Sequence, residues 1–278
     1  MRWYARPQLE TPAATPAAAA EELTPSRGDL ERNFRIKYGD IETCGWSPRM
    51  RHRFGYFNPD DEYETLVDHL VGDRTVWLDA GCGRFLFPSN APLAKQLSER
   101  CAHLVGVDPD ETLEENPYVH EKARVLIDDY ETDRKFDLIT LRMVAEHVAE
   151  PDVTVESLAR LTRPGGRVVI FTIYRWSPVP LFTDIMPFGL HHPIKKLLWK
   201  TESKDTFPVA NKMNTRRALR RVFERHGFAE SSFRYVDDCR TFANSRILQW
   251  LELSAWRLLH TVGLHYPEVC LLAVYTRQ

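Results

Sequence analysis

The sequence lacks an excess of charge and lacks a long hydrophobic run. Its 37 basic and 39 acidic residues leave a formal net charge of −2, whereas proteins that mainly neutralise a phosphate backbone carry a clear basic excess. Nucleic acid is therefore not the expected partner. The most apolar long stretch, residues 247–262, falls short of the roughly 20 apolar residues that a membrane span needs. It is also interrupted by Gln249, Glu252, Arg257 and His260, so we expect no membrane span.

Paired cysteines are missing as well, and we expect no secretory leader. The five cysteines are an odd number, lie far apart and include no Cys-x-x-Cys pair of the kind that binds zinc or exchanges thiols. After Arg2 and Arg6, residues 9–20 mix Ala, Pro, Thr and Glu where a signal peptide has an apolar region. These absences favour a reduced, cytoplasmic location and no structural metal.

What remains is the composition of a globular protein, with 43% hydrophobic and 27% charged residues in a chain of 278. Residues 1–27, where alanine and proline recur, are predicted to form a flexible tail. Residues 28–73 are predicted to be an N-terminal helical cap, which includes a proline-initiated helix near residues 58–71. Residues 74–278 are predicted to form the main domain.

Short apolar runs alternate with helical patterns along the first half of this domain. Helices are predicted over Pro92–Arg100 and Pro151–Leu161. Strands that alternate with helices indicate a doubly wound α/β domain with a mostly parallel sheet covered on both faces. Five runs are typical of buried strands, and they are Thr75–Ala80, Ala102–Asp108, Arg124–Asp128, Phe136–Leu141 and Arg167–Thr172.

Two insertions interrupt the second half. Residues 174–210 combine five prolines with many aromatic residues, and residues 241–262 form a helical pattern that is apolar nearly all round. Such a helix is either buried or meets a partner. A helix over Thr215–His226 and strands over Ser232–Val236 and Glu268–Tyr275 are predicted around these insertions.

Glycines and a carboxylate follow the first predicted strand. Asp79, Gly81 and Gly83 stand in Leu-Asp-Ala-Gly-Cys-Gly, where bare backbone can approach a ligand closely. A carboxylate at Asp79 would repel a pyrophosphate, and Leu86 stands where a dinucleotide fingerprint needs glycine. Both features disfavour a nicotinamide or flavin dinucleotide.

Further carboxylates follow the next two strands. Asp108 ends the second strand, where an acidic residue can accept hydrogen bonds from ribose hydroxyls, and Asp128 and Asp129 end the third, where an adenine amine could donate. Ligands of open α/β sheets bind at these carboxyl ends. The pattern therefore suits an adenosine that carries positive charge.

The motifs LDAGCG, LVGVDPD, LIDDY, FDLITLRMVAEHV and LARLTRPGGRVVIFT resemble the class I S-adenosylmethionine-dependent methyltransferases over residues 60–175. The resemblance implies an enzyme with a Rossmann-like sheet, an antiparallel last strand and S-adenosylmethionine as cofactor. It also assigns roles to residues: the loop of Asp79, Gly81, Cys82 and Gly83 for the amino-acid end of the cofactor, Asp108 for ribose, Asp128 and Asp129 for adenine, and Leu141 and Arg142 for the methionine part.

Phe85 departs from the family pattern, which often has a third glycine there. Either the loop is rearranged around an intact cofactor site, which we favour, or the chain is a non-catalytic binding or scaffold protein. Cys82 fits a small space-filling residue better than a nucleophile, and His147 fits a partly buried structural histidine better than a catalytic base.

The insertions are predicted to build the acceptor side. Residues 174–210 would form a lid over a moderately apolar small molecule. Either His191 or His192 acts there as a base, or, as we favour, both histidines face solvent on a packed lid. Residues 204–208 with Asn211 and Asn214 resemble bacterial methyltransferases of glycan and natural-product pathways, which suggests O-methylation of a hydroxyl. The helix at 241–262 would cover the acceptor pocket or form a homodimer, and a membrane-surface role ranks below these two.

Overall fold

The computed structural model of the protein describes residues 23–177 and 209–278. Its centre is a seven-stranded sheet with the order β3-β2-β1-β4-β5-β7-β6. Strands β1 to β5 pair in parallel, whereas β7 is antiparallel to both β5 and β6. The predicted doubly wound sheet with an antiparallel last strand is thus confirmed. The strands are β1 (Val76–Ala80), β2 (His103–Val107), β3 (Glu121–Ala123), β4 (Phe136–Arg142), β5 (Thr162–Ile173), β6 (Phe228–Asp237) and β7 (Val269–Arg277).

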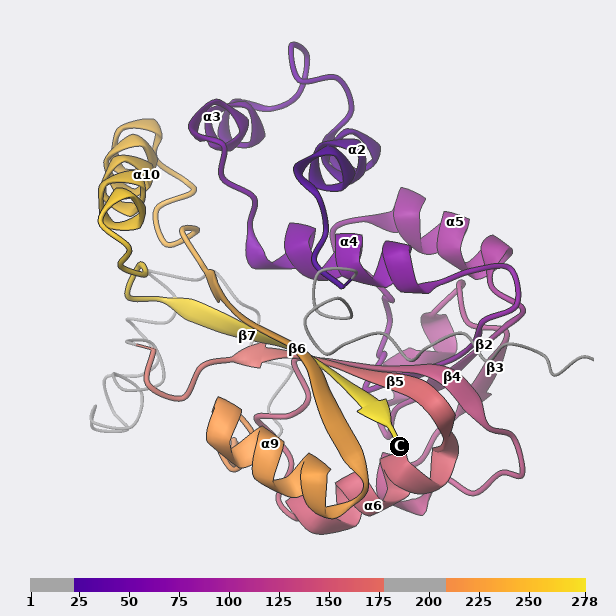
Figure 1. The fold of residues 1–278 in the computed structure, drawn as a ribbon. Helices are drawn as coiled ribbons and strands as arrows, with labels where there is room; N and C mark the ends of the chain where they lie inside the picture. The colour runs from indigo at the N-terminus through magenta and orange to yellow at the C-terminus, as the bar shows by residue number, and fades with distance from the viewer. Residues whose placement is uncertain (1–22, 178–208) are drawn as a thin grey trace, which may run out of the picture.

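Helices cover both faces of this sheet (Figure 1). Side chains alternate between the faces along each strand, so Trp77 packs with Leu66 and Leu97 in one buried cluster while Leu78 packs with Leu158 in the other. Each face therefore has its own core. The covering helices are α4 (Pro59–Leu70) and α5 (Ala91–Arg100) on one face and α6 (Pro151–Leu161) and α9 (Arg216–Arg225) on the other.

The strand order reverses between β1 and β4. Ala80 at the end of β1 is level with Val107 of β2 and with Leu141 of β4, so the carboxyl ends of all three strands reach the same edge. The chain leaves β1 toward β2 and returns to β4 on the other side of β1. Such a switch point opens a crevice for a ligand.

The third predicted strand is wrong in position. We expected it over Arg124–Asp128, but β3 is Glu121–Ala123, and residues 127–129 form a short 3-10 helix, η2 (Ile127–Asp129). Val125 and Leu126 look like strand residues in sequence, yet both side chains are exposed. β3 is an edge strand with one neighbour, so the apolar run does not mark a buried segment there.

Two further helices, α2 (Arg27–Tyr38) and α3 (Trp46–Phe54), lie above α4 in the view of Figure 1. Ser26 caps α2 through a capping box with Asp29, and Leu23 is buried in the core beside α4. We had predicted that residues 23–27 belong to a flexible tail. They do not, because Leu23 buries its apolar side chain and Ser26 caps a helix. The remaining tail residues lie outside the described ranges.

A buried charge network joins α2 to α4. The Lys37 ammonium lies 3.0 Å from Asp61 and 2.9 Å from Glu64, and its side chain is 1% exposed. Asn90, the N-cap of α5, donates to Glu64. Burial is opposed by the Lys37 charge but still raises the pKa of Glu64 to about 7. These contacts anchor α2 to both α4 and α5.

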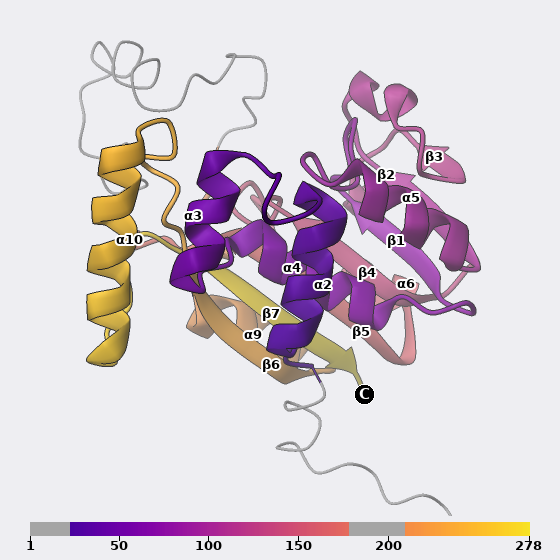
Figure 2. The ribbon, with the colours of Figure 1, turned by 90° about the horizontal axis from the view of Figure 1, so that it is seen from above.

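The helix α10 (Arg246–Thr261) stands beside α3 in both ribbon views (Figure 2). It begins after residues 241–245, which form turns rather than the start of the helix that we predicted. Ser245 caps it. No helix in the described ranges is long and apolar enough to cross a membrane.

Candidate active site

The loop after β1 brings two glycines to the switch point. Gly81 and Gly83 have φ angles of 72° and 45°, in the left-handed region that favours glycine. The Gly81 N–H donates to the Val107 carbonyl at 2.7 Å. A Cβ added at Gly81 would overlap the side chain of Val144. The bare backbone is thus required by torsion and by space at this turn.

Asp108 follows β2 and holds the glycine loop. Its carboxylate accepts hydrogen bonds from the backbone N–H of Gly83 at 2.9 Å and of Asp110 at 2.8 Å. A Cβ added at Gly83 would stand 3.9 Å from Asp108 Oδ2 and from Thr112 Oγ1. The glycine backbone therefore lies directly beside the carboxylate, and an added Cβ would be in van der Waals contact with it.

Asp79 lies at the end of β1 and is 3% exposed. The hydroxyl of Thr140 donates to its carboxylate, and the indole of Trp77 donates to Thr140 Oγ1 at 2.8 Å. Burial raises the pKa of Asp79 to about 7, against the Thr140 hydrogen bond and the charge of Arg142, and the neighbouring Asp108 charge adds to the rise. This carboxyl would be ionised more readily beside a bound cation.

Asp128 presents an acceptor that no described residue satisfies. Its Oδ1 atom is buried without a hydrogen-bond partner in the described part of the chain. Burial raises the pKa of Asp128, although a hydrogen bond from Thr154 opposes the shift. Buried acceptors are rarely left unpaired, so this oxygen suits a ligand donor. Asp129 is exposed and turns its backbone N–H to Leu126.

These features fit S-adenosylmethionine better than a phosphate-bearing cofactor. Carboxylates stand at the end of β1, directly after β2 and in η2 after β3, and the glycine loop lies beside Asp108. Negative charge favours a sulfonium and an ammonium and disfavours phosphates. The unpaired oxygen of Asp128 could accept from an exocyclic amine.

Arg142, the last residue of β4, is tied to the N-terminal helices. Its guanidinium lies 2.7 Å from Asp60 on α4, and Arg240 also binds the Asp60 carboxylate. Although burial alone would raise the pKa of Asp60, the charges of Arg240 and Arg142 hold it well below its usual range. Asp60 is therefore an ionised clamp that joins α4, β4 and the segment before α10.

Cys82 is buried between the glycines, and all five cysteines of the chain are buried and free. Asn116 donates weakly to its sulfur at 3.9 Å and more directly to the Gly83 carbonyl at 3.0 Å. Burial raises the pKa of the Cys82 thiol, so a thiolate is disfavoured. The geometry agrees with a space-filling residue.

Phe85 is exposed to solvent. Its side chain is 48% exposed, and the neighbouring Arg84 forms a surface ion pair with Glu115 at 2.8 Å. Gly81 and Gly83 nevertheless keep the torsions and hydrogen bonds of the loop. The bulky residue at 85 is accommodated in solvent rather than inside the crevice.

The segment after β4 contains Glu146 and His147. Glu146 is buried, accepts a hydrogen bond from the Thr172 hydroxyl at 2.5 Å, and has a raised pKa because of burial. His147 is half-buried, and its backbone N–H donates to the Val144 carbonyl. His191 and His192 lie outside the described residues. Among residues 23–177 and 209–278, no cluster of three or more side chains could hold a metal ion.

Sequence reasoning missed Asp60, Thr140, Asn116 and Arg240 as parts of this region. Thr140 lies in a buried strand, where a threonine is typical of packing, and Asn116 lies in a loop that has no recognisable motif. Asp60 reads as a helix-cap residue, because its partners Arg142 and Arg240 are 82 and 180 positions away in sequence. Arg142 was included because the family resemblance places residues at the end of this strand beside the methionine part of the cofactor.

Comparison with known proteins places the chain among related sequences. A family model described as a methyltransferase domain matches residues 49–230. A ubiquinone biosynthesis O-methyltransferase from Coxiella burnetii is 24% identical over 200 residues, which cover 64% of this chain and 83% of the relative. The protein with that name from Maricaulis maris is 28% identical over 180 residues, covering 58% of this chain and 68% of the relative.

Solved structures also resemble the chain, at lower identity. The N-methyltransferase NodS from Bradyrhizobium japonicum WM9 has a TM-score of 0.48 and 13% identity, covering 79% of this chain and 96% of its own. The cyclopropane synthase MmaA2 from Mycobacterium tuberculosis has a TM-score of 0.48 and 12% identity, covering 92% and 99%.

Proposed function

The chain belongs to the class I S-adenosylmethionine-dependent methyltransferases, and from this premise we propose that it methylates a hydroxyl group of a small molecule. That it is an enzyme with S-adenosylmethionine as cofactor follows from the family. Hydroxyl as the acceptor atom is our proposal. The observation that carries it is the naming of its curated relatives, which are O-methyltransferases of ubiquinone biosynthesis.

We propose the following roles for the residues of the site. Asp79 accepts from the ammonium of the cofactor, Asp108 accepts from its ribose hydroxyls, and Asp128 accepts from its adenine amine, with Asp129 beside it. Gly81, Cys82 and Gly83 provide backbone that approaches closely. These roles are supported by the burial of Asp79, by the position of Asp108 beside the glycine loop and by the unpaired oxygen of Asp128.

The cofactor supplies an activated methyl carbon on a sulfonium. The main work left to the protein is alignment of the acceptor oxygen with that carbon, and a base is needed only where the hydroxyl must lose its proton. Arg142, fixed by Asp60, would position the end of β4 beside the methionine part. A small-molecule acceptor from a glycan or natural-product pathway remains a prediction. Because the relatives are named for ubiquinone biosynthesis, a phenol should be tested as an acceptor alongside alcohols.

The activity is tested by product analysis with the full chain. Incubation with S-adenosylmethionine and matched phenol, alcohol and amine acceptors should release S-adenosylhomocysteine and add one methyl mass only to hydroxyl compounds. Methylation confined to amines would contradict the proposal of O-methylation. Calorimetry with S-adenosylhomocysteine provides the cofactor test, since no binding at millimolar ligand would contradict the proposed cofactor site.

Asp108→Asn tests the ribose contact. Loss of charged hydrogen bonds of about 1.5–3 kcal/mol should weaken S-adenosylhomocysteine binding by about tenfold to a hundredfold. Asp133→Asn makes the same chemical change at an exposed aspartate outside the site and should leave affinity unchanged. Equal affinity of Asp108→Asn and wild type would refute the assignment.

A further inference from the structure

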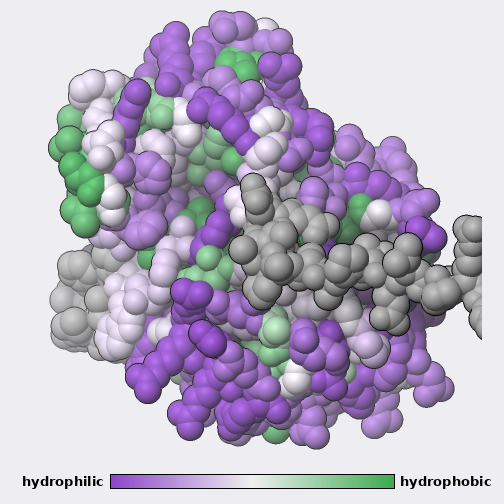
Figure 3. All heavy atoms as spheres, in the orientation of Figure 1, coloured by the Kyte–Doolittle hydropathy of each residue, from purple (hydrophilic) through white to green (hydrophobic). Residues whose placement is uncertain are grey.

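The outer face of α10 is apolar and open to solvent over the whole helix. Ile247 is 75% exposed and Leu258 is 67% exposed, and Trp250 and Leu251 between them are about half exposed. At 1.5 Å per residue, the helix is about 24 Å long. Figure 3 shows hydrophobic residues gathered over α10 at one edge of the molecule. Contiguous apolar surface of this kind marks an interaction site.

The opposite side of α10 is firmly attached to the protein. Gln249 donates to Ser47 of α3 at 2.8 Å, and the Trp256 indole donates to Asp237 at 3.1 Å. Leu253 is buried in a cluster with Tyr56. These contacts fix the orientation of α10, so its apolar outer face stays directed toward solvent.

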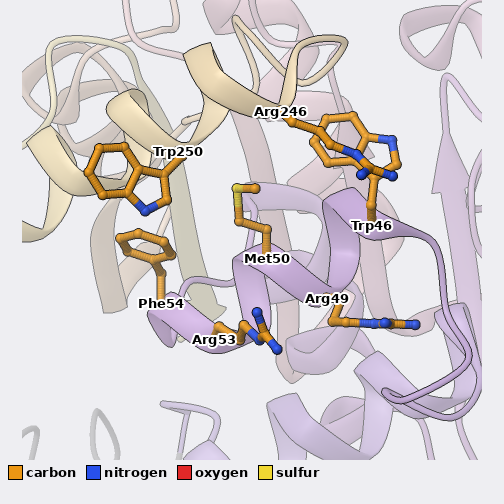
Figure 4. Close-up of a pocket in the computed structure, with 7 residues that line it drawn as sticks. All are labelled: Trp46, Arg49, Met50, Arg53, Phe54, Arg246 and Trp250. Carbon is orange, nitrogen blue, oxygen red and sulfur yellow. The ribbon is translucent and has the colours of Figure 1, made fainter.

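A cavity of about 360 Å³ lies between parts of α3 and α10, and Trp250 of the apolar face lines it. Figure 4 shows Phe54 of α3 beside Trp250 of α10, with Met50 next to them. Arg53 lies at the same cavity, and Arg246 lies over the Trp46 ring at 5.6 Å from its centroid. Aromatic rings bordered by arginines are typical of segments that lie at a membrane–water interface.

The exposed charges on this surface are of one sign. Arg53, Arg246 and Arg257 are exposed and form no ion pair with any residue in the described ranges. α3 contains no acidic residue, and the single acid of α10, Glu252, is buried and accepts hydrogen bonds from Thr241 and Phe242. The chain as a whole has a net charge of −2, so this cationic surface is local.

We propose that α3 and the outer face of α10 dock on a bilayer surface that contains anionic phospholipids. The apolar side chains would enter the interface while the arginines pair with lipid phosphates. A second copy of this chain is the less suitable occupant. A two-fold interface would bring the arginines of both copies together with no exposed acid on either helix to pair with them.

The test is flotation of the full chain with vesicles of phosphatidylcholine alone or with 30% phosphatidylglycerol added, a composition chosen on the order of that in anionic membranes. The wild type should float only with the anionic vesicles, and less at high salt. Arg53→Gln with Arg246→Gln should weaken the partition by about 25-fold, since each arginine near the surface contributes about fivefold. Ile247→Asn with Leu251→Asn should abolish flotation.

The matched control removes the same charge from the other side of the sheet. Arg217 and Arg221 of α9 are exposed, and Arg217→Gln with Arg221→Gln should float like wild type. Absence of flotation in wild type, or equal losses in both arginine pairs, would overturn the proposal. So would a concentration-dependent dimer in sedimentation that Ile247→Asn with Leu251→Asn dissociates, in the absence of vesicle binding. None of these readouts uses methyl transfer, so a failed activity test leaves them interpretable.

Discussion

Asp79 is a carboxyl whose protonation the fold and the cofactor control in opposite directions. In the protein without ligand, burial raises its pKa to about 7, compared with about 3.9 in an unfolded chain. The folded protein therefore binds more protons than the unfolded chain between about pH 4 and 7. This group's contribution to stability accordingly falls as the pH rises through that range.

If the ammonium of the cofactor pairs with Asp79, binding should release a proton. Calorimetry with S-adenosylhomocysteine at pH 6, in buffers of different ionisation enthalpy, should report release of up to about one proton, and near zero above pH 8. Affinity should rise from pH 5.5 to 7.5 and then level off. Asp79→Asn should remove both effects. A proton count that does not change with pH in wild type would contradict the proposed contact.

Gly81 should tolerate no side chain. Gly81→Ala places a Cβ against Val144 in a left-handed torsion. We therefore expect a loss of stability above the roughly 1–2 kcal/mol of the torsion itself, together with weaker S-adenosylhomocysteine binding. Gly165→Ala is the control, because its φ of 76° is similar and nothing lies within 4 Å of the added Cβ. Equal melting-temperature shifts in the two variants would show that the overlap is relieved at little cost.

Site residues that follow recognisable strands could be predicted from the sequence. Site residues brought together by packing between segments far apart in the sequence could not. Asp79 and Asp108 follow recognisable buried strands, so parallel pairing brings them to the same edge. Asp60 gave no such signal, because its position beside Arg142 depends on how α4 packs on the sheet. The roles of these residues toward the cofactor remain predictions.

At the scale of elements, one buried cation contributes to the attachment of α2. Lys37→Met would leave Asp61 and Glu64 with a missing partner inside the protein, and breaking a buried pair in this way costs about 3–5 kcal/mol. Urea unfolding should show this loss. Lys95→Met removes an exposed lysine with an i,i+4 partner, and it should cost less than about 0.5 kcal/mol. Arg51 also lies 3.3 Å from Asp61, so similar losses in both variants would mean that Arg51 compensates for Lys37.

Elements at the centre of the sheet or packed directly on it were predicted more accurately than elements at the periphery. β4 and α6 were expected over Phe136–Leu141 and Pro151–Leu161 and occur over almost the same residues. β3 was misplaced because an edge strand carries no continuous burial. The setting of α10 was not predictable, since it depends on contacts such as Gln249 with Ser47, 202 positions apart.

At the scale of the whole molecule, β7 completes the sheet by entering between β5 and β6. Removal of residues 268–278 would separate β6 from the sheet and expose the core side chains of β7's neighbours. We expect this variant to lose cooperative thermal unfolding, whereas removal of Gln278 alone should lower the melting temperature by only a few degrees, in line with a small change in stability. A cooperative melt in the longer deletion would show that the β1–β5 half is stable without β7.

The position of β7 also has a consequence for synthesis. The ribosome makes β5 and β6 before β7, yet neither strand pairs with the other. Until α10 has been synthesised, β5 and β6 each have an unpaired backbone edge. Such edges can pair with other chains and lead to aggregation. The apolar face of α10 emerges during the same interval. Chaperone demand for this protein should therefore concentrate in the period between the appearance of β6 and that of β7, rather than being spread over its synthesis.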